Sequence, residues 1–169
     1  MQCDDFKLKL ISPTDYCCKS SHMNEPLVEI YINSKEIVPI LIKCELSYQL
    51  KDDVKDVGSY GHLIARHFLY SLNEVKIAGS YSNEYGVYLV CCDGCGEPGC
   101  ASVSTKISED ANYVYWTDFE NEHMRDWKYN ISYMFEKNKY YKEIKRFEKM
   151  LKKCNLQIKK AGLYWKIKM

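Results

Sequence analysis

The stretch formed by residues 86–119, GVYLVCCDGCGEPGCASVSTKISEDANYVYWTDF, decides the fold of this chain. It contains three segments rich in β-branched and aromatic residues, the composition that strands favour. These segments are residues 86–92, 101–107 and 113–119, and turn residues separate them. Because tight turns join only antiparallel neighbours, the stretch predicts a three-stranded antiparallel meander.

A further pair of strands is expected nearer the N-terminus. Leu27–Ile32, LVEIYI, alternates between apolar and polar side chains as a half-buried strand does. Residues 33–35 supply a turn, and residues 36–42 continue as an apolar run that contains Pro39. Since proline cannot donate to a strand ladder, we expect a β-hairpin whose second strand lies at a sheet edge.

Helical patterns occur in two places. Residues 62–72 predict a short central helix, preceded by a polar loop over residues 51–61. A short strand is expected at residues 131–135, after which Asn138 caps a longer C-terminal helix with lysines on one face. The apolar face of that helix is predicted to consist of Tyr141, Ile144, Phe147 and Leu151.

The expected fold class is therefore α+β. An antiparallel sheet, made of the N-terminal hairpin and the three-stranded meander, is packed with the short central helix and the longer C-terminal helix. A length of 169 residues is in the range of one domain, so residues 1–169 are treated as a single domain. Residues 152–169 are expected to form a C-terminal strand or arm of it.

The turn after the first strand of the meander is rich in cysteine and glycine. Cys92, Cys95 and Cys100 follow the spacing C-x2-C-x4-C, and a C-x-x-C turn commonly supplies two ligands to tetrahedral zinc. His123, just beyond the third strand, is the candidate for a fourth ligand, whereas Cys91 points to the opposite strand face. Two alternatives stay open: a glycine-rich turn without metal, and a thiol redox centre. Zinc is the candidate cofactor, although folding of a chain this long requires none.

The same stretch resembles a widespread family of small bacterial proteins to which no enzymatic activity is assigned. The resemblance is carried by a C-x(1–2)-C-G-x-x-G-C turn, a V-x-W-x-D-F strand, a W-x-Y segment and an aromatic lead into the last helix. It implies a fold more than a function, and Ser34 departs from the glycine usual in the family's first hairpin. The matching positions are Cys92, Cys95, Gly96, Gly99, Cys100, Trp116, Asp118, Phe119, His123, Trp127 and Tyr129.

No catalytic motif is recognisable in the sequence. It contains no G-x-S-x-G, Walker loop or H-E-x-x-H, and none of its four histidines lies in a known catalytic frame. We therefore expect no enzymatic activity. The N-terminus lacks the basic and apolar regions of a signal peptide, and no run is long enough to span a membrane. The expected location is cytoplasmic, with no membrane partner.

Charge is distributed unevenly along the chain. Residues 1–126 contain 11 basic and 20 acidic residues, a net charge of −9, whereas residues 127–169 contain 13 and 3, a net charge of +10. An acidic body, here residues 1–126, favours fast association with a basic protein, and nucleases are basic because they bind phosphate. The sequence therefore suggests an immunity protein or antitoxin that masks the active site of a cognate bacterial toxin domain, a basic nuclease.

The candidate toxin-binding residues lie in two segments. Asp52, Asp53, Asp56 and Tyr60 occupy the polar loop, and Asp93 and Glu97 occupy the cysteine-rich turn. The alternative function is a zinc-stabilised module for nucleic-acid binding or for general protein interaction. Tyrosines and lysines alternate in the C-terminal helix as in nucleic-acid-binding proteins. The acidic body would repel phosphate, so nucleic acid is the less favoured partner.

Overall fold

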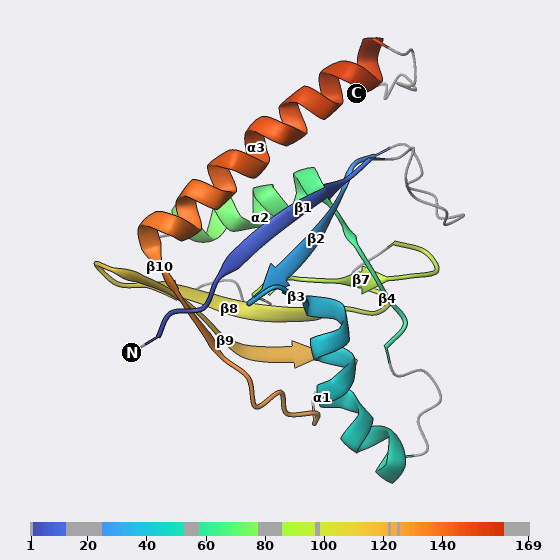
Figure 1. The fold of residues 1–169 in the computed structure, drawn as a ribbon. Helices are drawn as coiled ribbons and strands as arrows, with labels where there is room; N and C mark the ends of the chain where they lie inside the picture. The colour runs from blue at the N-terminus through green and yellow to red at the C-terminus, as the bar shows by residue number, and fades with distance from the viewer. Residues whose placement is uncertain are drawn as a thin grey trace.

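The structure, a computed structural model, describes residues 2–12, 25–52, 58–77, 86–96, 99–121, 123–124 and 126–160. These residues adopt an α+β fold with antiparallel sheets and three helices, which confirms the predicted fold class (Figure 1). Their buried apolar side chains form one main core cluster that extends from Phe6 to Leu151 along the chain. The N-terminal and C-terminal parts of the described chain therefore share a core.

The first sheet contains an N-terminal strand that the sequence analysis missed. β1 (Phe6–Ile11) pairs antiparallel with β2 (Leu27–Ile32), which also pairs with the short strands β3 (Lys35–Glu36) and β5 (Leu63–Ile64). The first four residues of β1, FKLK, alternate between buried and exposed positions. That pattern buries one face of the sheet and leaves lysines on the other.

The prediction that residues 36–42 form the second strand of the hairpin is wrong. The chain leaves β3 directly into α1 (Ile37–Asp52), so that Pro39 lies in the first turn of a helix. Proline is tolerated there because the first N–H groups of a helix have no partner within it. Ile37, Leu41 and Glu45 are buried at four-residue spacing, which is the period of a helix.

The second sheet confirms the predicted meander and extends it by a fourth strand. Its order is β10–β9–β8–β6, with every neighbour antiparallel. The strands are β6 (Val87–Tyr88), β8 (Val103–Glu109), β9 (Tyr113–Asn121) and β10 (Tyr133–Glu136). The predicted first strand, residues 86–92, is divided between two sheets, because β7 (Cys91–Cys92) pairs instead with β4 (Tyr60–Gly61).

The two other predicted helices are present with different bounds. α2 (Ala65–Ile77) is the central helix, and α3 (Lys137–Lys160) packs on β1 and α2. Asn138 lies inside the first turn of α3 and is not its cap. Residues 152–160 continue the helix, which contradicts a strand or arm there, and residues 161–169 lie outside the described part of the chain. Within the described residues, no helix combines the length and apolarity needed to cross a membrane.

The face of α3 that meets the core also differs from the prediction at one position. Ile144, Phe147 and Leu151 are buried as predicted, but Tyr140 takes the place expected for Tyr141. The ring of Tyr140 stacks on Phe6 of β1 at a centroid distance of 4.6 Å, whereas the hydroxyl of Tyr141 donates to Glu109 at the surface. This contact joins the C-terminal helix to the N-terminal strand.

Side chains of α3 cover the outer edge of β1. The backbone N–H of Leu8 donates to Glu143 Oε1 at 2.7 Å, and the guanidinium of Arg146 donates to the carbonyl of Leu8. Arg146 also donates to Glu143, which is buried. An open strand edge invites pairing with another chain, so these two side chains protect β1 from such contacts.

Candidate metal centre

The thiol turn, residues 91–100, begins in the short strand β7, which pairs with β4. Cys91 and Cys92 pair through their backbones with Gly61 and Tyr60 of β4. The chain then reverses, and the N–H of Gly96 donates to the carbonyl of Cys92 at 2.8 Å. Gly96 has a φ of 74°, a left-handed conformation that glycine adopts without strain. The reversal brings Cys95 back toward Cys92.

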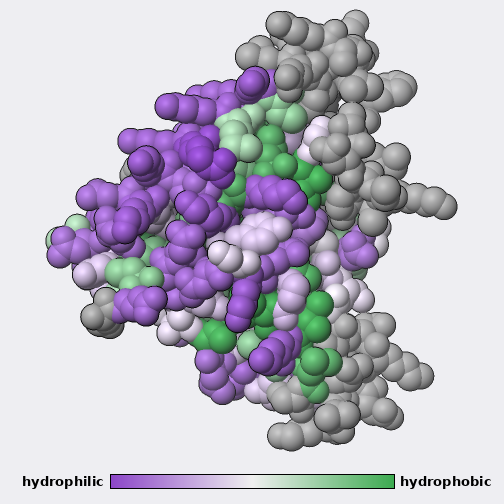
Figure 2. Space-filling model, in the orientation of Figure 1, coloured by the Kyte–Doolittle hydropathy of each residue, from purple (hydrophilic) through white to green (hydrophobic). Residues whose placement is uncertain are grey.

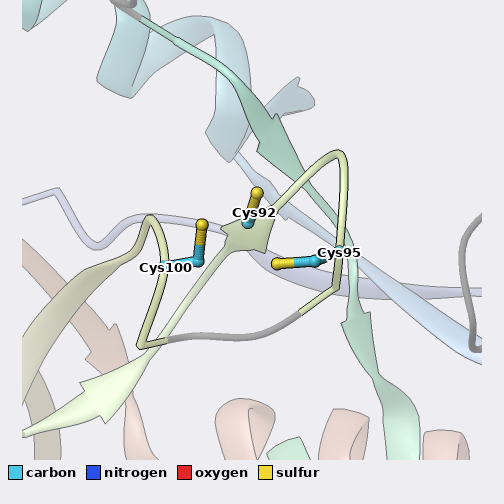
Figure 3. Close-up of side chains that lie close together, drawn as sticks. All are labelled: Cys92, Cys95 and Cys100. Atoms are coloured by element: carbon cyan, nitrogen blue, oxygen red, sulfur yellow. The ribbon is translucent and has the colours of Figure 1, made fainter.

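The structure brings the three predicted thiol ligands together. The Sγ atoms of Cys92, Cys95 and Cys100 all lie within 4.8 Å of one another, and Figure 3 shows them gathered around a shared space. Tetrahedral zinc with Zn–S bonds of about 2.3 Å requires sulfur atoms about 3.8 Å apart. Three thiols at this spacing could therefore hold a metal ion after small side-chain rotations. Soft sulfur donors of this kind favour zinc over magnesium or calcium.

Cys91 is excluded from the cluster, as the alternation of a strand predicts. Its side chain is buried and its thiol donates to the carbonyl of His62 at 3.1 Å, away from the turn. In contrast, Cys92 and Cys95 are half-buried and Cys100 is exposed. The cluster is consequently accessible to a metal ion from solvent.

His123 returns to the same end of the meander without joining the thiols. Its Nε2 donates to the carbonyl of Gly99 at 2.9 Å, and its backbone N–H donates to Asn121 Oδ1 at 2.9 Å. Among the described residues, the group with metal-ligand spacing contains the three cysteines alone. The position of His123 next to Cys100 is what the sequence predicts, and its role as a fourth ligand stays a prediction.

The thiols differ in how readily they lose a proton. The backbone N–H of Cys95 and the neighbouring thiols donate hydrogen bonds that lower the pKa of Cys92. Hydrogen bonding to Cys92 and Cys95, and the charge of those thiols, raise the pKa of Cys100 to about 11. Cys92 therefore loses its proton more readily than Cys100, and binding of a metal would release the protons that the thiols still hold.

The residues predicted to bind a toxin are only partly described. Asp53, Asp56 and Glu97 lie outside the described residues, and Asp52 ends α1 without a described side chain. Asp93 is exposed at the tip of the thiol turn.

Tyr60 does not lie on a polar loop, so its predicted placement is wrong. It belongs to β4, and its hydroxyl donates to Glu45 Oε1 at 2.5 Å while accepting from Asn121 Nδ2 at 2.8 Å. This inward hydrogen bonding leaves it a poor surface anchor.

A buried polar cluster around Glu45 was missed by the sequence analysis. The side chain of Glu45 is 1% exposed, and Oε1 accepts from the hydroxyls of Tyr60 and Tyr129, while Oε2 has no hydrogen-bond partner among the described residues. Burial raises the pKa of Glu45, an effect that the tyrosine hydrogen bonds oppose. The only sequence signal was the helical spacing of Ile37, Leu41 and Glu45, which the assignment of a strand concealed.

Comparisons of the chain with protein-family models, curated proteins and solved structures find no match. The resemblance noted from the cysteine turn and the tryptophan strand therefore stays a prediction. What the protein does has to be inferred from its own residues, and the thiol cluster is the most specific chemical feature among them.

Proposed function

We propose that this is a zinc-binding protein that acts by binding another macromolecule. The observation that carries the proposal is the convergence of Cys92, Cys95 and Cys100 within 4.8 Å on one turn. Reduced cysteines that bind no metal gain nothing from lying this close together, whereas a soft divalent cation requires several sulfur ligands within bonding distance. The lowered pKa of Cys92 makes loss of its proton to a metal ion easier.

The proposed ion would act as a structural link. Cys92 is paired with β4, and Cys100 lies shortly before β8, so an ion held by both would connect the two-stranded pair to the larger sheet. Zinc with three protein ligands keeps one open position, and His123 could fill it by releasing the carbonyl of Gly99. A closed site of this kind stabilises the fold without taking part in a reaction.

Zinc content provides the test. Purified protein is expected to contain about one zinc ion per chain, and Cys95→Ser is expected to lower the content at least tenfold because only two thiols remain. Cobalt substitution should give a thiolate-to-metal charge-transfer band that the variant lacks. The matched control is Cys3→Ser, which alters a half-buried cysteine outside the cluster and should leave the zinc content unchanged.

If the reduced wild-type protein neither contains nor takes up zinc or cobalt, and a chelator leaves its melting temperature unchanged, the turn is a metal-free glycine-rich turn. His123→Gln addresses the fourth ligand separately. It should weaken zinc affinity if the imidazole binds the ion, and it should have no effect if water does.

Neutralisation of a toxin domain is the second candidate function. It is favoured by the net charge of −9 over residues 1–126 and by the exposed carboxylate of Asp93 at the tip of the thiol turn. Co-expression with a toxin domain encoded by an adjacent gene should restore growth, and Asp93→Asn should weaken the complex. A toxin that remains fully active, with no complex formed, would refute this candidate and leave the zinc proposal untouched.

A further inference from the structure

The solvent face of α3 carries a continuous row of lysines. Five exposed lysines fall within about 100° of arc around the helix axis, given 3.6 residues per turn. We call this row the lysine face, and it consists of Lys142, Lys145, Lys149, Lys152 and Lys153. Ile144, Phe147 and Leu151 point to the opposite side and are buried. Figure 2 shows hydrophilic side chains along the outer edge of α3.

The lysine face differs from the other basic residues of α3 in its ion pairing. Lys137 pairs with Glu109 at 2.9 Å, and Lys139 pairs with Glu136 at 2.7 Å. Arg146 pairs with Glu143 at 2.6 Å. For the five lysines of the face, the described part of the chain offers no ion pair. Their charges are available to a partner.

We infer that the lysine face binds the phosphate backbone of double-stranded nucleic acid. The cores of protein interfaces are depleted in lysine and rich in aromatic residues, and the lysine face contains no aromatic side chain. An ammonium group on a flexible stem acts as a point charge that suits phosphate. The composition of the face therefore favours a polyanion over an acidic protein.

The spacing of the lysines also fits a phosphate backbone. From Lys142 to Lys153 the helix rises about 16 Å at about 1.5 Å per residue. One strand of a duplex places a phosphate about every 3.4 Å along its axis, so about five phosphates match the length of the face. Tyr140 is buried and Tyr141 is half-buried with its hydroxyl on Glu109, so neither ring is free to stack on bases. Binding should consequently be independent of sequence and should not favour single strands.

The acidic residues of positions 1–126 lie outside α3, so the helix itself sets the charge next to the lysine face. The ion pairs Lys9–Glu29, Arg66–Glu25 and Lys106–Asp118 are already counted in the net charge of −9, whereas Lys137 of α3 neutralises Glu109. Between residues 144 and 153, Glu148 is the one acidic residue of the helix. With five basic residues and one acidic residue, positions 144–153 of the helix carry a net charge of +4.

Salt dependence of binding tests the inference. Fluorescence anisotropy of a short labelled DNA duplex, titrated with the full-length protein, gives the association constant at several salt concentrations. Five phosphate contacts predict a slope of log K against log[salt] of about −4.5, or a loss of about 500-fold between about 50 and about 200 mM salt. The triple variant Lys142→Gln/Lys145→Gln/Lys149→Gln should reduce the slope to about −2, since two contacts remain.

A matched control separates the lysine face from net charge. Lys35→Gln/Lys43→Gln/Lys128→Gln removes the same charge at exposed positions outside α3 and should leave both affinity and slope unchanged. A duplex of RNA and one of DNA, measured in parallel, decide which nucleic acid binds more tightly.

The inference is overturned if no duplex binds at about 50 mM salt, if the two triple variants lose affinity equally, or if single strands or anionic vesicles bind instead. Because Cys95→Ser leaves the lysine face intact, duplex binding by that variant keeps this test independent of zinc.

Discussion

Replacing Trp116 by alanine is expected to destabilise the protein by about 3–5 kcal/mol. The side chain is fully buried, and its ring lies 5.3 Å from Phe6, 5.4 Å from Phe135 and 6.2 Å from Tyr140 between ring centroids. These partners come from β1, β10 and α3, so the indole joins the two sheets to the last helix. Small domains have a total stability of about 5–15 kcal/mol, and the loss would be a large fraction of it.

The measurement is urea unfolding followed by tryptophan and tyrosine fluorescence, compared with circular dichroism. Trp116→Phe keeps most of the ring volume but loses the N–H that donates to the Tyr140 hydroxyl at 3.2 Å, so its cost should be intermediate. Tyr70→Ala removes a ring that is 65% exposed and should change stability by less than about 0.5 kcal/mol. Equal losses for Trp116→Ala and Tyr70→Ala would contradict the assignment of Trp116 to the core.

Structure fixed by neighbouring residues could be predicted from the sequence. The meander is of this kind, because Asp110 accepts the N–H groups of Asn112 and Tyr113 at 2.7 Å and so sets the turn between β8 and β9. The thiol cluster is also local, since one short turn carries all three cysteines. In both cases the interactions that decide the geometry join residues only a few positions apart.

Structure that depends on distant residues could not be predicted. β1 pairs with β2 across a long connection, as Phe6 lies opposite Ile32, and its register is decided by a partner that the sequence does not identify. Pro39 allowed two interpretations, a sheet edge or a first helical turn, and local sequence did not separate them. The Glu45 cluster required α1, β4 and Tyr129 to be placed together before any of its hydrogen bonds existed.

Glu45 should give the second large effect, through its burial in that cluster. Glu45→Ala is expected to destabilise the protein by about 2–4 kcal/mol, because the hydroxyls of Tyr60 and Tyr129 lose their buried acceptor and a cavity forms. Glu45→Gln retains a carbonyl acceptor and the side-chain volume, so its cost at neutral pH should be clearly smaller. Thermal unfolding of the three proteins provides the comparison, and equal costs for the two variants would show that the carboxyl group does not organise this cluster.

The pH dependence of stability distinguishes the charge of Glu45 from its shape. Burial raises the folded-state pKa of Glu45 above its ordinary value of 4.5, so the folded protein holds the proton more tightly than the unfolded chain. The resulting stabilisation is complete below about pH 4.5 and is lost as the pH rises through the pKa of Glu45 in the folded protein. Glu29, Glu143 and Asp110 have lowered pKa values and act in the opposite sense, but they are common to both proteins and cancel in the difference. The free energy of unfolding of wild type, relative to that of Glu45→Gln, should therefore fall as the pH rises from about 4.5 toward neutrality. If the difference between the two free energies is constant with pH, Glu45 ionises as freely in the folded protein as in the unfolded chain.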